Sequence, residues 1–374
     1  MLCTMRDTKK IIVRLVESIV PVGFWDFVWG KYYIWSIKRK GSEKNESGYY
    51  VKHKGRNTPN YCVFCFREGL GLFAVANQML FYYEWAVKNH YIPLVYAEYS
   101  AKGETKNIWE TCFVQPEDLK EVFDKGNVLV NGQNAGQVLR GTCKKINGDP
   151  KDAYVHAKSQ NYQEYYADLK KISEKVWKFK PDVEMKIENV ARHIFKPGMR
   201  VMGVILREEF GMDEAELTPE QRAVYKKHPR ALSLEETYRI ITEYMAQWGC
   251  THVLISTMFE ESIHYFKDRL EDKVLYIDRM RRNYDTFKKD NAKLIACLTH
   301  RDNAELRKWR EEAQMTVDKE EQWNIEYATE VAIVAKCNCC MGVKCSGLIA
   351  ACILNGGAFE NLYVFKDENN IERY

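Results

Sequence analysis

Short apolar runs alternate with helix-like stretches through the C-terminal half of the chain. Val201–Leu206 is apolar or glycine throughout, as in a strand that is buried on both faces of a sheet. A helix pattern with Ser233 as N-cap and Glu236 three residues later comes next. It is followed by "THVLISTM", "EESIHYFKDRL" and "KVLYI", which alternate as strand, helix and strand. This order and spacing predict the α/β class with a doubly wound parallel sheet.

The N-terminal half contains a second pattern of this kind. "YYVKH" and "YCVFCF" are typical of strands, and a glycine-rich turn follows them. A helix is then predicted over about Ala74–Asn89, followed by a strand over Ile92–Tyr96. A strand, a helix and a strand in succession indicate a second layered α/β domain.

The length of 374 residues suits two domains better than one. The polar run "KGSEKNESG" predicts a linker before the first of them, and "KPG" a turn before the second. We therefore expect a basic, aromatic helical arm with its linker (1–48), an N-terminal Rossmann-like domain (49–196) and a C-terminal Rossmann-like domain (197–374) that carries a charged helical insert (278–322).

Two interpretations of the arm stay open. Its residues 9–40 combine helical apolar spacing with basic and aromatic side chains, which fits peripheral contact with an anionic membrane surface. They fit better a helical arm packed on its own protein or on a second subunit, which is the interpretation we favour. The sequence shows no signal peptide and no disulfide framework, so we expect a cytoplasmic protein, at the inner face of the membrane under the first interpretation. The net charge of +4 comes from residues of both signs spread along the chain, which does not indicate a nucleic-acid partner.

Four cysteines lie close together in "CNCCMGVKC". If this stretch is a strand, Cys337 and Cys339 share one face and Cys340 points to the other. Three thiolates in that arrangement cannot converge on one zinc ion without a knuckle turn, and Cys62 and Cys65 face the same obstacle. We therefore predict no metal site and interpret these cysteines as small buried apolar residues.

The turn "GVKCSG" that follows the cysteine-rich strand predicts a phosphate site. A turn of small residues leading into a helix presents free backbone N–H groups and the positive end of the helix dipole. Lys344 adds charge there, and Ser346 can donate a hydrogen bond. Ligands of open α/β sheets bind beyond the carboxyl ends of the strands, so Arg207, at the end of the first strand, is expected to face the same crevice. These groups together would suit a diphosphate.

Several motifs occur in an order that resembles the nodulation and α-1,6-fucosyltransferase family. They are "GLGLFAVANQ", "GVILRE", "HP", "ISTMFEE" and "EYATEVAIVAKCNCCMGVKCSG", and the resemblance spans about residues 60–365. It implies an inverting glycosyltransferase with two facing Rossmann-like domains, the GT-B fold. The implied partners are a nucleotide-sugar donor, GDP-fucose, in the C-terminal domain and a glycan or lipid-linked glycan acceptor on the N-terminal side.

The resemblance also implies roles for individual residues. Arg207 matches an arginine that holds the donor diphosphate, and His228 matches the histidine of a His-Pro pair. Glu330 matches an acidic residue that contacts the donor nucleotide. Small hydroxyl residues that begin the final helix and bind phosphate are matched by Cys345 and Ser346, with only one hydroxyl kept. Lys344 and Gly347, which flank them, are expected to bind the donor as well.

The chain departs from the family pattern in two places. Glu208 and Glu209 follow Arg207 where relatives carry Arg or Gly and then Thr-Asp. After the second strand of the C-terminal domain, Met258 and Phe259 precede the acidic Glu260. These changes motivate an alternative, a catalytically inactive sugar-nucleotide-binding protein.

The implied reaction needs a positive group near the leaving diphosphate. The sequence contains no Asp-x-Asp motif of the kind that holds a metal ion in other transferases. We therefore expect no metal or other cofactor, with Arg207 and the helix start neutralising the charge. The acceptor hydroxyl also needs a base, and Glu208, Glu209 and Glu220 stay open as candidates.

The segment "GLGLFAVANQ" lacks the third glycine of the dinucleotide fingerprint. This disfavours a second alternative, an NAD-dependent oxidoreductase. We expect Gly69 and Gly71 to form a loop at the cleft between the domains, and Asn77 and Gln78 to be structural residues of the helix that follows.

Overall fold

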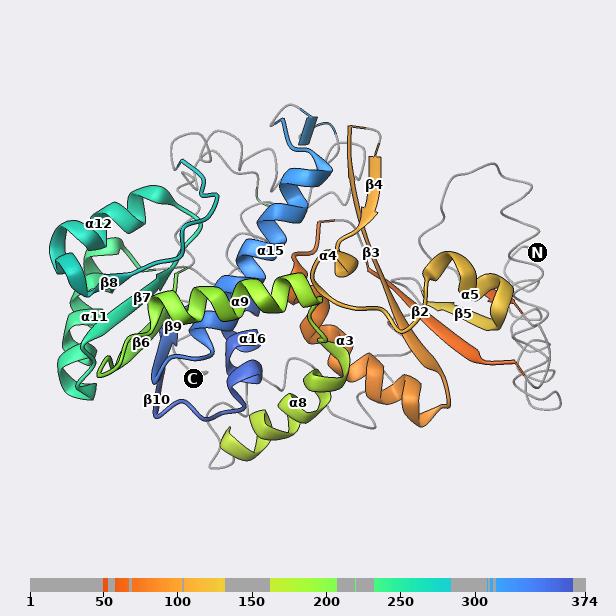
Figure 1. Cartoon of the computed structure of the whole chain (residues 1–374), viewed down its shortest axis with the longest axis horizontal. Coiled ribbons are helices and arrows are strands. Elements are labelled where there is room, and N and C mark those ends of the chain that lie inside the picture. The colour runs from red at the N-terminus through yellow and green to blue at the C-terminus, as the bar shows by residue number, and fades with distance from the viewer. Residues whose placement is uncertain are drawn as a thin grey trace, which may run out of the picture. The chain divides into compact units, whose positions relative to one another are not determined.

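The computed structural model describes most of the two predicted α/β regions (Figure 1). The N-terminal arm, Arg207, Glu208, Glu209, Glu220, His228 and most of the predicted insert lie outside the described residues. The described residues are 50–52, 58–66, 69–102, 104–131, 162–206, 219, 232–283, 308, 310–311 and 314–365.

Contacts divide the chain into two compact units. The first consists of Met1–Phe66, Tyr82–Tyr96 and Gln115–Asn147, and the second of Arg67–Phe81, Ala97–Val114 and Gly148–Tyr374. The predicted domain boundary between residues 196 and 197 stays a prediction.

The N-terminal sheet has five strands in the order β1-β5-β2-β3-β4. β2 and β5 are parallel, whereas β1 is antiparallel to β5 and β4 is antiparallel to β3. In the first unit, Tyr61, Val63, Leu94, Val122 and Val128 form a buried apolar cluster. The strands are β1 (Tyr50–Lys52), β2 (Asn60–Phe66), β3 (Ile92–Ala101), β4 (Glu104–Asn107) and β5 (Asn127–Asn131), and the helices are α3 (Leu72–Lys88), α4 (Trp109–Cys112) and α5 (Leu119–Lys125).

The C-terminal sheet is the one that positions the candidate site. It has five strands in the order β10-β9-β6-β7-β8, and every neighbouring pair is parallel. Numbered from β6 along the chain, this is the 3-2-1-4-5 order of a Rossmann sheet read from its β8 edge. The predicted doubly wound sheet is therefore confirmed. Its strands are β6 (Val201–Ile205), β7 (His252–Ser256), β8 (Val274–Leu275), β9 (Cys339–Gly342) and β10 (Asn361–Val364).

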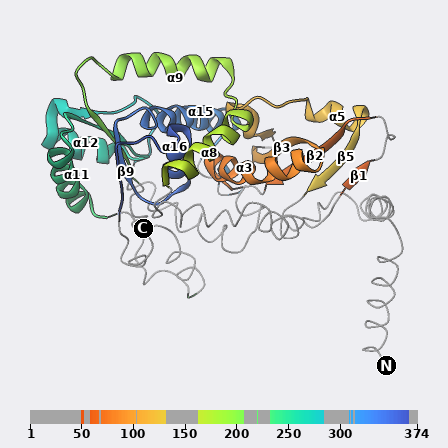
Figure 2. The same cartoon turned by 90° about the horizontal axis from the view of Figure 1, so that it is seen from below.

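Helices cover both faces of this sheet (Figure 1). Met202 and Val204 of β6 point to the face on which α11 and α12 form a continuous apolar core with the sheet. Gly203 points to the other face, where an added Cβ would lie 2.8 Å from a methyl group of Val334 on α15. Figure 2 shows α9 lying over α15 on that side. The helices of this unit are α8 (Tyr162–Val176), α9 (Pro181–Ile194), α11 (Leu234–Trp248), α12 (Glu260–Leu270), the 3-10 turn Glu271–Lys273, α15 (Val317–Val334) and α16 (Ser346–Asn355).

Most helices and strands lie where the sequence predicts them, and the differences are at their ends. Ser233 caps α11 as predicted, since its hydroxyl accepts from the Glu236 N–H at 3.1 Å. The strand predicted over Ile92–Tyr96 continues to Ala101, because it pairs with β4 beyond Tyr96. α15 begins at Val317, within the range of the predicted insert, where the Thr316 hydroxyl caps it. Among the helices described, none is long and apolar enough to cross a membrane.

Candidate functional site at the carboxyl edge of the C-terminal sheet

The order of the strands places a reversal point between β6 and β9. The chain runs outward from β6 to β7 and β8, and then returns to add β9 and β10 on the other side of β6. In open α/β sheets, ligands bind outside the carboxyl ends of the strands at such a reversal point. The two strands are close there, because the Val343 N–H donates to the Ile205 carbonyl at 3.1 Å. Arg207 follows β6 two residues after Ile205, and Lys344 follows β9 two residues after Gly342.

The start of α16 lies at this reversal point and has no side-chain cap. Its N-cap is Cys345, whose side chain accepts no hydrogen bond from the first turn. The first N–H groups of a helix lack intrahelical acceptors, and the helix dipole adds partial positive charge to them. Lys344 and Ser346 retain accessible surface, while Cys345 and Gly347 are buried. Of the phosphate ligands predicted here, Lys344 and Ser346 are therefore the two that are not buried.

Gly347 is held against Tyr327 of the preceding helix, α15. A Cβ added to Gly347 would collide with the Tyr327 hydroxyl oxygen. The Tyr327 ring also packs edge-on against Phe73 of α3, at 5.5 Å between ring centroids. Gly347 thus permits the close approach of α15 to the first turn of α16.

Replacing Gly347 with alanine is expected to lower stability by about 1–3 kcal/mol, the usual cost of inserting a methyl group into a packed site. Thermal denaturation would measure this cost. Adding Tyr327→Phe to the variant should recover part of the loss, because it removes the atom that the methyl group meets. Gly71→Ala is a matched control, since an added Cβ meets nothing within 4 Å there. An equal loss for both glycine variants would contradict the account.

The segment "GLGLFAVANQ" reaches the same helix start. The Gly71 carbonyl accepts from the Ala74 and Val75 N–H groups and so opens α3. The Asn77 side chain donates to the Ser346 carbonyl at 3.0 Å, which joins α3 to α16 across 269 residues of sequence. The prediction that Asn77 is structural is confirmed, and Gln78 bonds to the Ala74 carbonyl within α3. Gly69 has a φ of 90°, which glycine adopts without strain.

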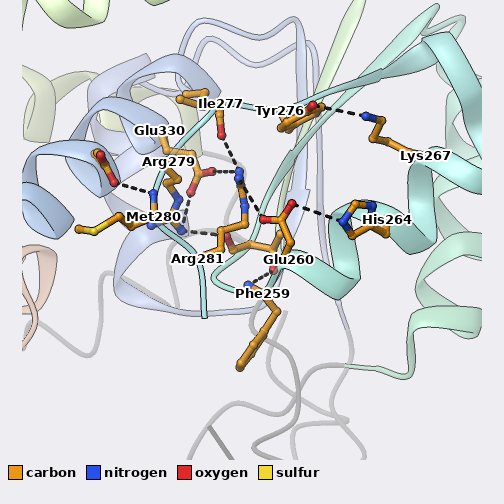
Figure 3. Close-up of polar contacts among 12 residues, drawn as sticks. Phe259, Glu260, His264, Lys267, Tyr276, Ile277, Arg279, Met280, Arg281 and Glu330 are labelled. Carbon is orange, nitrogen blue, oxygen red and sulfur yellow. Dashed lines mark hydrogen bonds and ion pairs between the residues drawn. The ribbon is translucent and has the colours of Figure 1, made fainter. Parts of the chain in front are cut away.

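Glu330 lies on α15 and has no accessible surface. Its Oε2 accepts from the Ser256 hydroxyl at 2.8 Å and lies 3.1 Å from Arg279 Nη2. Its Oε1 lies 3.7 Å from Arg281 Nη2 (Figure 3). Desolvation raises the pKa of the Glu330 carboxyl, and the two guanidinium groups and the Ser256 hydroxyl oppose that shift.

Neither Arg279 nor Arg281 was among the site residues predicted from the sequence. They belong to "DRMRRN", directly after the strand "KVLYI". The Arg279 side chain donates to the Thr257 carbonyl at 2.8 Å, just beyond the end of β7. Its guanidinium carbon lies 5.1 Å from the ring centroid of Trp323. Burial lowers the pKa of Arg281, and the Glu330 carboxylate counteracts the shift. The available signal was a group of three arginines, Arg279, Arg281 and Arg282, placed immediately after a strand of the predicted sheet.

The cysteine-rich segment is arranged differently from its prediction. Cys337 precedes β9 in the turn that ends α15, so the expectation that it shares a strand face with Cys339 is wrong. Cys339 joins the core under α11 and α12, whereas the Cys337 sulfur lies 3.2 Å from the position of a Cβ added to Gly203, on the opposite face. Burial is the main cause that raises the pKa of Cys250 to about 12, with the neighbouring Cys339 thiol contributing.

Within the described ranges, no three Cys, His, Asp or Glu side chains are grouped to hold a metal ion. That the chain carries no zinc stays a prediction. Elemental analysis of the purified protein is expected to show far less than one zinc per chain, and a value near one would contradict it.

Comparisons with known proteins find similar structures but no similar sequences. No family model matches the chain, and no curated protein matches it in sequence. Among solved structures, it is similar to NodZ α-1,6-fucosyltransferase soaked with GDP-fucose, with 9% identity, a TM-score of 0.41, and 79% of this chain and 93% of that chain covered. It is similar to fucosyltransferase NodZ from Bradyrhizobium, with 9% identity, a TM-score of 0.40 and coverage of 79% and 92%. It is also similar to POFUT1 in complex with GDP-fucose, with 10% identity, a TM-score of 0.41 and coverage of 84% and 99%.

Proposed function

We propose that the protein is a metal-independent glycosyltransferase that moves a sugar with inversion from a nucleoside-diphosphate donor, GDP-fucose, to a glycan hydroxyl. The observation that carries the proposal is the uncapped start of α16 at the reversal point between β6 and β9, with Lys344 and Ser346 accessible there. The sequence motifs that resemble the fucosyltransferase family support the choice of donor.

The site suits the charge changes of glycosyl transfer. The bond between the anomeric carbon and the diphosphate oxygen breaks, and the acceptor oxygen attacks from the opposite face of the sugar. Negative charge grows on the leaving phosphate, where preorganised positive groups lower the barrier most. Lys344, the first N–H groups of α16 and Arg207 would supply this charge.

The acceptor hydroxyl loses its proton to a carboxylate in this mechanism. Glu208, Glu209 and Glu220 are the candidates, since they follow the donor-binding Arg207 closely in sequence. The acceptor is proposed to be a glycan or a lipid-linked glycan held by the N-terminal domain. His228 is proposed to contact the donor.

Product analysis tests the proposal. The full chain is incubated with radiolabelled GDP-fucose and a panel of glycan acceptors in the presence of EDTA. Acceptor-dependent release of GDP together with a labelled glycan is expected. Binding of GDP-fucose with neither hydrolysis nor transfer would favour the inactive sugar-nucleotide-binding alternative, and the absence of binding would refute both.

A further inference from the structure

Arg279, Arg281 and Glu330 form a buried charged cluster beside β7, on one side of the reversal point. Figure 3 shows Arg279 and Arg281 converging on Glu330. The side chains of both arginines are 2% exposed, and that of Glu330 is fully buried. Buried charges are tolerated when they are paired, and Glu330 is the buried carboxylate that both arginines share.

The cluster fixes two loops to each other at the carboxyl edge of the sheet. Arg279 donates to the Thr257 carbonyl after β7. The Arg282 N–H donates to the Met258 carbonyl at 2.8 Å, and the Met280 N–H donates to Glu326 Oε2 at 2.8 Å. The segment after β8 is thereby bound both to the end of β7 and to α15.

Arg279 also connects this cluster to the proposed donor site. Its guanidinium carbon lies 5.8 Å from the centroid of the Tyr327 ring, and the hydroxyl of Tyr327 lies against Gly347 in the first turn of α16. Glu330 holds Arg279, Arg279 lies over Tyr327, and Tyr327 packs on the helix start proposed to bind phosphate. Through these contacts, Glu330 can affect a donor bound at the carboxyl ends of β6 and β9 without touching it.

We propose that Glu330 is a positioning residue that does not contact the donor and that holds Arg279, and through it Tyr327, in the arrangement that the start of α16 requires. This inference rests on the proposed function. It departs from the role that the family resemblance implies for Glu330, because the carboxylate has no accessible surface that a nucleotide could touch. Its Oε2 is engaged by Ser256 and Arg279, and its Oε1, which accepts no hydrogen bond from a described residue, is buried beside Arg281.

Two ligands distinguish the roles open to Glu330. GDP carries both a nucleoside and a diphosphate, whereas pyrophosphate carries the diphosphate alone. Loss of a contact to the nucleoside would therefore weaken only GDP, and a displaced phosphate site would weaken both ligands. In the Glu330→Gln variant, well below its melting temperature, we expect both affinities to fall by the same factor, about three- to tenfold. Calorimetry measures the ratio of the two dissociation constants, which should stay within about twofold of the wild-type ratio.

Glu326→Gln is the matched control. Glu326 is also buried and lies one turn earlier on α15, and it accepts from the Met280 N–H and from the Gln322 side-chain amide. A glutamine there keeps an oxygen for the Met280 N–H, and Gln322 can turn its amide over to accept from the new NH₂ group. We expect both affinities of this variant to be unchanged. Should Glu330→Gln fail to fold, Ser256→Ala removes only the hydroxyl that donates to Glu330 and should weaken both ligands equally, by about two- to threefold.

A loss of GDP affinity without a matching loss of pyrophosphate affinity, in Glu330→Gln or Ser256→Ala, would overturn the inference. It would mean that Glu330 touches the nucleoside. Unchanged affinities for both ligands would also overturn it and leave Glu330 with a role in stability alone. If the wild-type protein binds neither ligand, the proposed function fails first, and a positioning role for Glu330 fails with it.

Discussion

Replacing Arg207 with lysine is expected to cut sugar transfer by about a hundredfold or more while leaving the fold intact. Leu206, just before it, is buried and its N–H donates to the Ser256 carbonyl at 2.8 Å, so the chain is fixed up to the residue before Arg207. Lysine keeps the charge but not the planar fork that binds two phosphate oxygens at once. Loss of one preorganised donor at a developing negative charge typically costs this much.

Steady-state transfer rates and thermal denaturation together check this expectation. Arg200→Lys is the matched control, because Arg200 lies just before the first residue of β6, at the end of the strand away from Arg207. Its Nη2 lies 2.6 Å from Glu360 Oε2. The transfer rate of this variant should be close to that of the wild type. A folded Arg207→Lys protein with near-normal transfer would remove Arg207 from the mechanism.

Replacing Arg279 with methionine is expected to destabilise the protein by about 3–5 kcal/mol. The change leaves Glu330 Oε2 without its guanidinium partner in a fully buried position, and breaking one side of a buried ion pair costs this much. Replacing the whole cluster with apolar residues, as in Arg279→Met, Arg281→Met and Glu330→Leu together, should recover much of the loss because no buried charge remains.

Urea denaturation of the variants measures these differences. Arg239→Met is the control. Arg239 Nη1 lies 4.0 Å from Glu243 Oε2, and both side chains are mostly exposed. Exposed ion pairs of this kind contribute at most about 1 kcal/mol to stability. If Arg279→Met lost as little stability as Arg239→Met, the buried pair would not be needed for the fold. A triple variant less stable than the single one would contradict the argument from desolvation.

The C-terminal sheet could be predicted because its signals are local. Val201–Leu206 carries the apolar run of a buried strand, and Ser233 carries the cap of the helix that follows. The direction and order of the strands then follow from the handedness of strand–helix–strand connections and the return of the chain to β9. The lysine and serine after β9 could be placed at the ligand edge for the same reason.

The cluster around Glu330 could not be predicted in this way. Its members come from β7, from the segment after β8 and from α15, and only the packing of α15 across the sheet brings them together. Nothing in the sequence near Glu330 distinguishes a carboxylate that reaches a ligand from one that pairs with two arginines. The contact of Tyr327 with Gly347 is equally non-local, so the sequence contains no sign that this glycine is also tightly packed.

Calorimetry of GDP binding in EDTA is the sharpest test of the proposed donor site. We expect the same affinity with and without the chelator, because fixed cations take the place of a metal ion. We also expect about tenfold weaker binding for Lys344→Ala, the size of one lost charge-assisted hydrogen bond, and unchanged binding for Lys336→Ala, an exposed lysine just before the amino end of β9. Loss of binding in EDTA, or equal binding by the two lysine variants, would contradict the proposed donor site.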